Sequence, residues 1–268
     1  MILPPNLLAL YAAHPINFVR EIIGVVPDPD QEKFLNSVRD HTRTAWRTGH
    51  GVGKTAAAAW LVIWWVYCFS PSLALVTAPT RDQLFDVLWL EIAKWLEQSK
   101  VARDVLWTAT ALSVVGNEKQ QVAQARTSNN PQALAGRHGP NVLLLGEEAS
   151  ALLEEIMEPM QGSMVGEHCR LALIGNPTQL TGTFYNAFHR DALDYARLHT
   201  PGEGHPRASL GDNIARIVRR YTRDSDVYRV RVAGEFPVGD PETFITFSRV
   251  EAAMQREVTP PESAPWVL

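Results

Sequence analysis

The sequence predicts an α/β fold in which a mostly parallel central sheet is flanked by helices, followed by a small C-terminal subdomain of helix and linker. The first observation is a set of short runs that are apolar throughout, at 72–78, 141–145 and 170–174, as expected of strands buried on both faces. The second is that helical segments alternate with these runs, an order that favours a parallel sheet covered by helices.

Composition and charge exclude several classes of protein. Of the 268 residues, 46% are hydrophobic and 20% charged, which is ordinary for a globular chain and excludes a disordered tail, a collagen or a coiled coil. The formal net charge is −4, so any contact with nucleic acid has to come from a local basic patch. The two cysteines, Cys68 and Cys169, are too few for a disulfide framework or a four-cysteine zinc site.

The N-terminal part begins with a helical approach segment at 7–26, which the turn-rich PDPD ends. Asp30 is then a plausible cap for a helix at 31–39. A strand at 42–47 follows, and a Gly-rich turn separates it from a strongly apolar helix at 55–69. This apolar run is shorter than the roughly 20 residues of a membrane span, and the N-terminus lacks the basic region of a signal peptide, so we expect neither.

The middle of the chain continues the alternation. Apolar residues recur at helical spacing in 80–98, which predicts a helix after the strand at 72–78. The segment 105–125 reads as short strands around the turn Gly116-Asn117. Buried strands at 141–145 and 170–174 complete the predicted sheet.

The C-terminal third differs in composition, and we divide the chain accordingly. We expect a nucleotide-binding core with its approach segment at 1–200, a C-terminal subdomain at 201–257, and a linker at 258–268. The subdomain opens with a Pro/Gly-rich loop and continues as an Arg-rich helical stretch, whereas VTPPESAP is typical of a linker.

The Gly-rich turn has the context and residues of a phosphate-binding loop, since RTGHGVGKT lies between a predicted strand and a predicted helix. Glycines allow successive N–H groups to point at phosphate oxygens, and the helix adds the positive end of its dipole. Lys54 is expected to reach the β- and γ-phosphates of ATP, and the Thr55 hydroxyl to bind Mg²⁺. The strict pattern has Gly where Thr48 stands. The candidate nucleotide-binding residues are Gln31, Thr48, Gly49, His50, Gly51, Val52, Gly53, Lys54 and Thr55.

A neighbouring apolar strand supplies acidic partners in VLLLGEEAS. Glu147 occupies the metal-associated position and Glu148 that of the catalytic base. The first acid is more often Asp, and the longer Glu147 is expected to reach Mg²⁺ through water. The alternative is an acidic helix start, since Glu154 and Glu155 also suit a helix N-terminus.

Two further polar residues are candidates for contact with the nucleotide. Asn176 follows a strand at the edge where ligands bind in open α/β sheets, and could sense the γ-phosphate; the alternative is a plain Asn-Pro turn. Gln31 could read the adenine edge with its amide, the alternative being an ordinary surface glutamine.

Together, these motifs resemble the ATPase domain of the large terminase subunit of tailed double-stranded DNA phages. The likeness spans about 31–247, and it depends on the order and spacing of the motifs more than on any single one. The matching segments are PDPDQ at 27–31, RTGHGVGKT at 47–55, TAPTRDQ at 77–83, LLLGEEAS at 143–150, IGNPTQLTGTFYNAF at 174–188 and RVAGEFP at 231–237.

The resemblance implies Mg²⁺-dependent ATP hydrolysis coupled to translocation of double-stranded DNA into a procapsid. It also implies a portal protein and a small terminase subunit as partners, a ring on the procapsid formed from subunits that are monomeric in isolation, and a location in the host cytoplasm without membrane contact. In the family a nuclease domain follows the ATPase domain. The ending PPESAPWVL resembles that junction, so no nuclease activity is expected in this chain.

The family also suggests which arginines act. His50 stands where many terminases carry a P-loop arginine, so another cation is needed near the γ-phosphate. We expect Arg137 to act as an arginine finger across a subunit interface, with Arg47 and Arg126 as lesser candidates; the alternative for Arg137 is a surface residue in a loop.

A motor has to grip every DNA sequence, which calls for phosphate contacts. The candidates for these contacts are Arg216, Arg219, Arg220 and Arg223, which recur at helical spacing and could line one face of a helix. The alternative is a solvated helix face whose arginines pair with acidic residues.

Two other functions stay open at this stage. One is a helicase-like DNA-dependent ATPase, although too little chain follows 176–177 for a second RecA-like domain. The other is a nucleotide-binding structural subunit with little turnover, which the unusual Glu147 and His50 would suit.

Overall fold

The computed structural model describes residues 3–127, 139–166, 168–208, 212–239 and 253–254. It contains an eight-stranded sheet in the order β3-β4-β5-β2-β6-β7-β1-β8. The strands are β1 (Arg43–Thr48), β2 (Ser72–Thr77), β3 (Val105–Trp107), β4 (Ala111–Val114), β5 (Gln121–Ala125), β6 (Asn141–Gly146), β7 (His168–Gly175) and β8 (Ala196–Thr200).

The sheet is mostly parallel, as predicted. Strands β5, β2, β6, β7, β1 and β8 run in one direction, and only the β3–β4 and β4–β5 pairings are antiparallel. The carboxyl ends of the parallel strands therefore meet at one edge, which is where open α/β sheets bind ligands.

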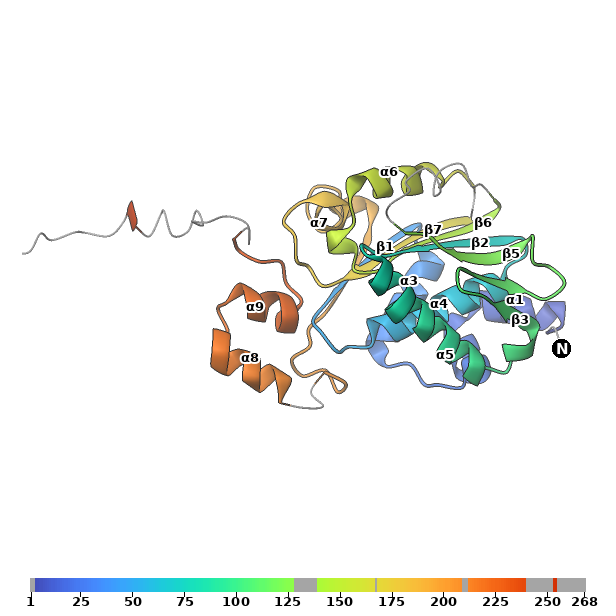
Figure 1. Ribbon diagram of the computed structural model, residues 1–268, viewed down its shortest axis with the longest axis horizontal. Coiled ribbons are helices and arrows are strands. Elements are labelled where there is room, and N and C mark those ends of the chain that lie inside the picture. Colours follow the sequence, from blue (N-terminus) through green and yellow to red (C-terminus); the bar gives the residue numbers. More distant parts are fainter. Residues whose placement is uncertain (1–2, 128–138, 167, 209–211, 240–252, 255–268) are drawn as a thin grey trace, which may run out of the picture.

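Side chains alternate between two apolar layers because successive residues of a strand point to opposite faces. In β6, Leu143 and Leu145 belong to one cluster of buried residues, whereas Val142 and Leu144 belong to the other. Helices cover both faces (Figure 1): α3 (Pro29–Asp40), α4 (Lys54–Cys68) and α5 (Leu90–Gln98) on one, and α6 (Glu154–Gly162) and α7 (Gly182–Asn186) on the other. Burial on both faces explains why these strands are continuously apolar.

Helix α4 lies at the centre of the first layer and is buried on nearly all sides. Its residues from Ala56 to Tyr67 are buried, as expected of a helix that is apolar all round. Trp64 donates from Nε1 to the Tyr11 carbonyl at 2.8 Å, and the Trp60 ring meets Trp95 edge-on at 5.2 Å. In the part of the chain that the structure describes, no helix is long and apolar enough to span a membrane.

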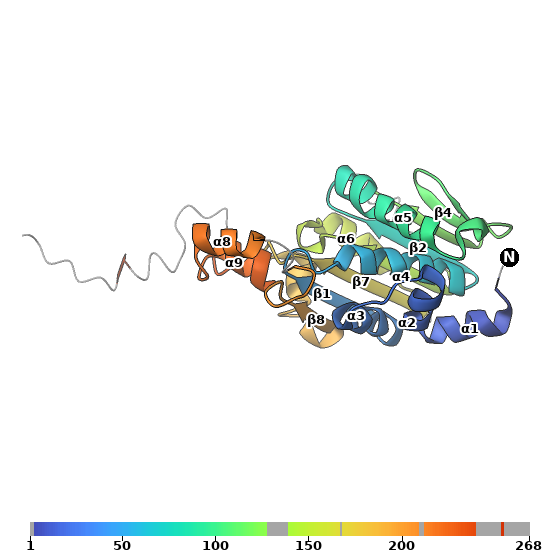
Figure 2. The same cartoon turned by 90° about the horizontal axis from the view of Figure 1, so that it is seen from below.

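The N-terminal approach segment is a series of short helices, α1 (Pro5–Ala13), α2 (Pro15–Phe18) and the π-helical turn η1 (Val19–Ile23), which pack beside α3 and α4 (Figure 2). The predicted cap of α3 is wrong. Asp28 caps the helix, accepting from the Asp30 and Gln31 amides, and Asp30 lies inside the first turn. Pro29 at the first helical position explains the shift, because its fixed φ suits that position.

The predicted helix at 80–98 is divided, with the π-helical stretch η2 (Gln83–Trp89) preceding α5. Strand β8 was not anticipated from the sequence. After β8 come α8 (Asn213–Tyr221), α9 (Asp226–Tyr228) and the π-helical turn η7 (Arg229–Ala233), which lie beyond the carboxyl end of β1 (Figures 1 and 2).

Candidate functional site

The loop between β1 and α4 has the backbone shape of a phosphate cradle. Gly51 and Gly53 adopt left-handed φ values of 80° and 82°, a conformation that glycine accepts without strain. Within the described residues, the amides of Gly51, Val52 and Gly53 donate no hydrogen bond. Free N–H groups beside a helix N-terminus are suited to phosphate oxygens.

The start of this loop is fastened by the C-terminal part of the chain. The Gly49 amide donates to the Thr200 carbonyl at 2.9 Å, and the His50 amide to the Arg231 carbonyl at 2.8 Å. The loop therefore has one end held by β8 and η7, while its glycine-rich half stays open.

The side chain of Lys54 lies between two of the other predicted site residues, Glu148 and Asn176. Its Nζ is 2.7 Å from Glu148 Oε1 and donates to Asn176 Oδ1 at 3.2 Å. Asn176 is buried and donates from Nδ2 to the Thr48 carbonyl at 2.5 Å. Asn176 thus connects the end of β7 both to the P-loop lysine and to the end of β1.

The second acid has an unusual backbone. Glu148 adopts a left-handed conformation at φ 48°, which is uncommon for a residue with a side chain and recurs at functional sites. The other oxygen of its carboxylate, Oε2, accepts from the backbone N–H of Asn176 at 3.5 Å. Both carboxylate oxygens therefore face the P-loop and the end of β7.

The first acid contacts the hydroxyl next to the lysine. Thr55 Oγ1 donates to Glu147 Oε1 at 2.6 Å, and Glu147 is only 2% exposed. Burial raises the pKa of Glu147 to about 7, and the Thr55 hydrogen bond and the charge of Lys54 oppose that shift. A bound cation would also lower the pKa of Glu147, because it stabilises the charged carboxylate.

The donor set fits a nucleotide-borne Mg²⁺. A hydroxyl and a carboxylate oxygen that already touch are hard ligands of the kind Mg²⁺ prefers. Among the residues in the described ranges, no three His, Cys, Asp or Glu side chains gather to hold a metal alone. The remaining ligands would have to be phosphate oxygens and water, which is the usual arrangement for Mg²⁺.

One expectation about the acidic strand is wrong. Strand β6, which carries Glu147 and Glu148 at its end, is not the neighbour of β1, because β7 lies between them. Contact is still made, since Thr55 approaches from α4 and the side chain of Asn176, the residue after β7, lies between Lys54 and the end of β1. Gly175 permits this approach: a Cβ there would lie 2.9 Å from the Ala149 amide nitrogen.

Gln31 supports the loop from behind. It is fully buried, and Nε2 donates to the Gly53 carbonyl at 3.0 Å while Oε1 accepts from the Asp28 amide at 3.0 Å. Its amide therefore has partners on both sides within the protein, and these contacts fix the P-loop to α3.

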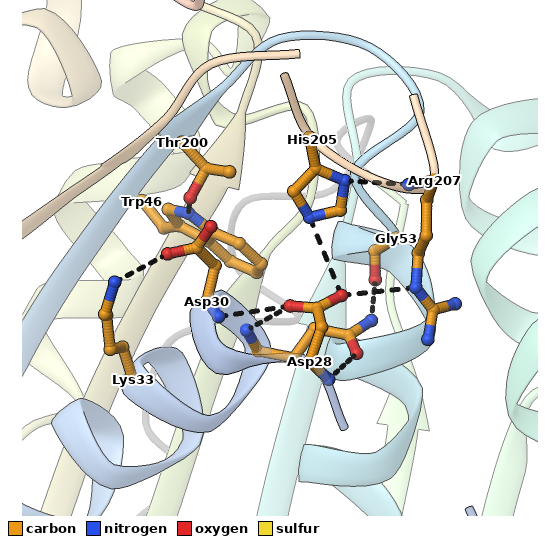
Figure 3. Close-up of polar contacts among 9 residues, drawn as sticks. Asp28, Asp30, Lys33, Trp46, Gly53, Thr200, His205 and Arg207 are labelled. Carbon is orange, nitrogen blue, oxygen red and sulfur yellow. Dashed lines mark hydrogen bonds and ion pairs between the residues drawn. The ribbon is translucent and has the colours of Figure 1, made fainter. Parts of the chain in front are cut away.

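A hollow of about 420 Å³ lies over the loop, bounded by α4, by η2 and α5, and by a residue the sequence reasoning missed. That residue is Arg207, whose Nε is 3.2 Å from Asp28 Oδ2 (Figure 3). Buried His205 approaches the same oxygen at 3.7 Å. The lining residues are Gly51, Val52, Gly53, Lys54, Thr55, Ala56, Val87, Glu91, Lys94, Trp95 and Arg207.

His50 lies beside this site with other cations around it. Burial and the nearby charge of Lys54 lower its pKa, and Glu148 opposes this shift. His50 therefore provides less positive charge at neutral pH than an arginine would, which leaves Arg207 as a cation close to the cradle.

The three finger candidates have different surroundings. Arg47 packs inside the sheet layer, its guanidinium 5.4 Å from the Phe188 ring centre, and burial lowers its pKa. Arg126 follows β5 and donates to Gln124 at 2.8 Å. Arg137 lies outside the described residues.

The four arginines expected on one helical face are not held together. Arg216 and Arg220 line a hollow with His50, whereas Arg219 pairs with Asp212 at 3.7 Å. Arg223 lies outside α8, since the helix ends at Tyr221 and Thr222 takes φ 64°. It pairs instead with Glu203 at 2.7 Å.

Comparison with known proteins places the fold. No protein-family model matches the chain. It is 24% identical over 277 aligned residues to a probable terminase large subunit of Enterobacteria phage P7, an alignment covering 98% of this chain and 56% of the relative. The chain thus spans little more than half the length of that relative.

Solved structures agree. The large terminase ATPase domain of Thermus phage P74-26 matches with a TM-score of 0.65 at 16% identity, over 83% of this chain and 98% of the other. The HK97 large terminase matches with a TM-score of 0.66 at 14% identity, over 84% of this chain and 55% of the other. A large terminase from a thermophilic bacteriophage, solved in complex with ADP, matches with a TM-score of 0.62 at 15% identity, over 79% of this chain and 54% of the other.

The predicted resemblance is therefore confirmed: this chain has the fold of phage large terminase ATPase domains, and it is similar in sequence to a probable terminase large subunit.

Proposed function

We propose that this chain is the Mg²⁺-dependent ATPase motor domain of a phage large terminase subunit, coupling ATP hydrolysis to translocation of double-stranded DNA into a procapsid. The observation that carries the proposal is the contact between Lys54, Glu148 and Asn176 beside open P-loop amides. The proposed nucleotide is ATP because Lys54 follows the cradle at the position that reaches the β- and γ-phosphates.

Lys54 and Glu148 would change partners when ATP binds. Their 2.7 Å ion pair leaves the base engaged. Phosphate oxygens would attract Lys54, and the freed Glu148 carboxylate would then orient a water and accept its proton. Asn176 contacts both Lys54 and the Glu148 carboxylate, and through these contacts it would relay loss of the γ-phosphate to β1 and β7.

Thr55 and Glu147 would hold Mg²⁺, with Glu147 acting directly or through water. When bound, the ion would neutralise phosphate charge during transfer. The carboxylate and hydroxyl already meet at 2.6 Å, so little rearrangement of the protein is needed to form this half of the coordination sphere.

Assembly is part of the proposal. The subunits would form a ring on the procapsid in the host cytoplasm, together with a portal protein and a small terminase subunit. Within each subunit, we propose the same division that the sequence predicts: core (1–200), subdomain (201–257) and linker (258–268). Arg137 would complete a neighbour's site, with Arg47 and Arg126 as lesser candidates. A finger in trans is worth about 10³–10⁵ in rate, so specific activity should rise steeply with assembly; equal activity in dilute and assembled protein would exclude it.

Steady-state ATP hydrolysis tests the proposal and separates it from a structural subunit with little turnover. Glu148→Gln should lower the turnover by at least about 100-fold, the usual scale for loss of a general base, with ADP affinity nearly unchanged. The matched control is Glu155→Gln, because Glu155 is an exposed glutamate at the start of α6. Wild-type protein without turnover, or equal loss in both variants, would contradict the proposal.

A further inference from the structure

A second hollow, of about 310 Å³, lies between the P-loop and α8. It shares no lining residue with the hollow above the cradle. Its walls are Asn213, Arg216, Ile217, Arg220 and Tyr221 of α8, with His50 and Arg231 opposite. Three arginines thus line one concavity in a chain whose formal net charge is −4.

These arginines carry uncompensated charge. In the described ranges, none of Arg216, Arg220 and Arg231 pairs with a carboxylate, and Arg216 contacts only the amide oxygen of Asn213, at 3.1 Å. Arg219 on the same helix instead has a carboxylate partner, Asp212. Arg216, Arg220 and Arg231 are exposed and without an acidic partner, so they are available to an anion from outside, and the planar fork of arginine matches phosphate oxygens.

We propose that this hollow binds phosphate groups of the duplex DNA backbone. The proposal rests on the proposed function and assigns the DNA grip to Arg216, Arg220 and Arg231, leaving out Arg219 and Arg223. Arg216 and Arg220 are one helical turn apart, so both can face one strand. Contacts to phosphate carry no sequence information, as a motor that meets every sequence requires.

The same hollow is connected to the nucleotide site through the backbone. Arg231 lines the hollow, and its carbonyl accepts from the His50 amide at 2.8 Å. His50 itself belongs to both the hollow and the P-loop. DNA in the hollow would therefore lie against His50, one of the first residues of the cradle, and we expect DNA to change the rate of ATP hydrolysis through this contact.

The test is DNA binding by the full chain, measured by fluorescence anisotropy of two duplexes of unrelated sequence over a range of salt concentrations. Arg216→Ala and Arg220→Ala should each weaken both complexes by about 5- to 10-fold and reduce the salt slope by about 1. Arg219→Ala is the matched control, on the same helix, and should change the affinity less than about twofold. Thermal unfolding of each variant checks that it is folded.

Several outcomes would overturn the proposal. Equal losses for Arg219→Ala would mean that α8 attracts DNA without a site, and a loss confined to one duplex would indicate base readout. A second arm measures a fluorescent ATP analogue without DNA: weakened nucleotide binding with intact DNA binding would assign the hollow to nucleotide phosphates. A different result separates the two proposals. If the wild-type chain hydrolyses no ATP, but Arg216→Ala and Arg220→Ala still weaken DNA binding and Arg219→Ala does not, the proposed function is wrong and the DNA site stands.

Discussion

Gly234→Ala is the substitution that tests most directly whether η7 holds the P-loop in place. Gly234 ends η7 with φ 68°, and a Cβ there would lie 2.6 Å from both the Gly49 amide nitrogen and the Thr48 carbonyl carbon. Both atoms belong to the backbone at the entrance of the P-loop. No side chain can rotate away, so the loop itself has to move.

Gly24 provides the matched control for the magnitude. It ends η1, another five-residue π-helical turn, with φ 83°, and a Cβ there would meet nothing within 4 Å. Gly24→Ala should therefore cost only the left-handed conformation, about 1–2 kcal/mol. Gly234→Ala adds overpacking of about 1–3 kcal/mol, so its total loss of unfolding free energy should be about 2–5 kcal/mol.

The assay combines denaturant unfolding with nucleotide titration of the folded variants. Gly234→Ala should weaken ADP binding by at least about tenfold, which corresponds to about 1.4 kcal/mol, because the cradle amides are displaced. Gly24→Ala should leave ADP affinity unchanged. If the two variants lose the same stability and bind ADP equally well, contact between η7 and the P-loop does not shape the site, and the reasoning fails.

Two further predictions concern the loop after β8. Arg207→Ala should weaken ATP binding by roughly 10-fold, since a charge-assisted contact to phosphate is worth about 1.5–3 kcal/mol. The control Arg20→Ala, which breaks the ion pair of Arg20 with Glu32 of α3, should leave ATP affinity unchanged. Equal losses of ATP affinity in isothermal titration would refute a phosphate contact by Arg207. The pKa of Glu203 is lowered to about 2 by hydrogen bonds from Arg223 and Tyr228. Its contribution to stability, under about 1 kcal/mol for so exposed a pair, should be present above pH 4.5 and lost as the pH falls towards 2; a Glu203→Gln difference in melting temperature that persists at pH 2 would contradict this.

The sheet and the phosphate cradle could be predicted because their signals are local. Apolar strands buried on both faces, and a Gly-rich turn before the apolar helix α4, are visible within windows of ten or fifteen residues. Strand order is different, since periodicity says which residues are buried and nothing about which strands are neighbours. The place of β7 between β1 and β6 therefore had no sequence signal.

Arg207 and the arginines of α8 show the same limit for the site. Arg207 lies in a Pro/Gly-rich loop, and its position at the cradle depends on the distant carboxylate of Asp28. The spacing of Arg216, Arg219, Arg220 and Arg223 fits one face only if the helix continues, whereas α8 ends at Tyr221. The turn-forming residues after Tyr221 were the available signal for that end.

The contacts of the P-loop determine what a change of nucleotide state can move. The loop is held at its start by carbonyls of Thr200 and Arg231, and at its end by the Gln31 amide. Lys54, which follows the loop as the first residue of α4, contacts Asn176 at the end of β7. A shift of the cradle backbone therefore has to break these bonds or carry η7 with it, and η7 bears the arginine that faces the α8 hollow. Because the open amides lie between these fixed points, a change at the phosphates can pass to the segment after β8 as well as to β7 and α3.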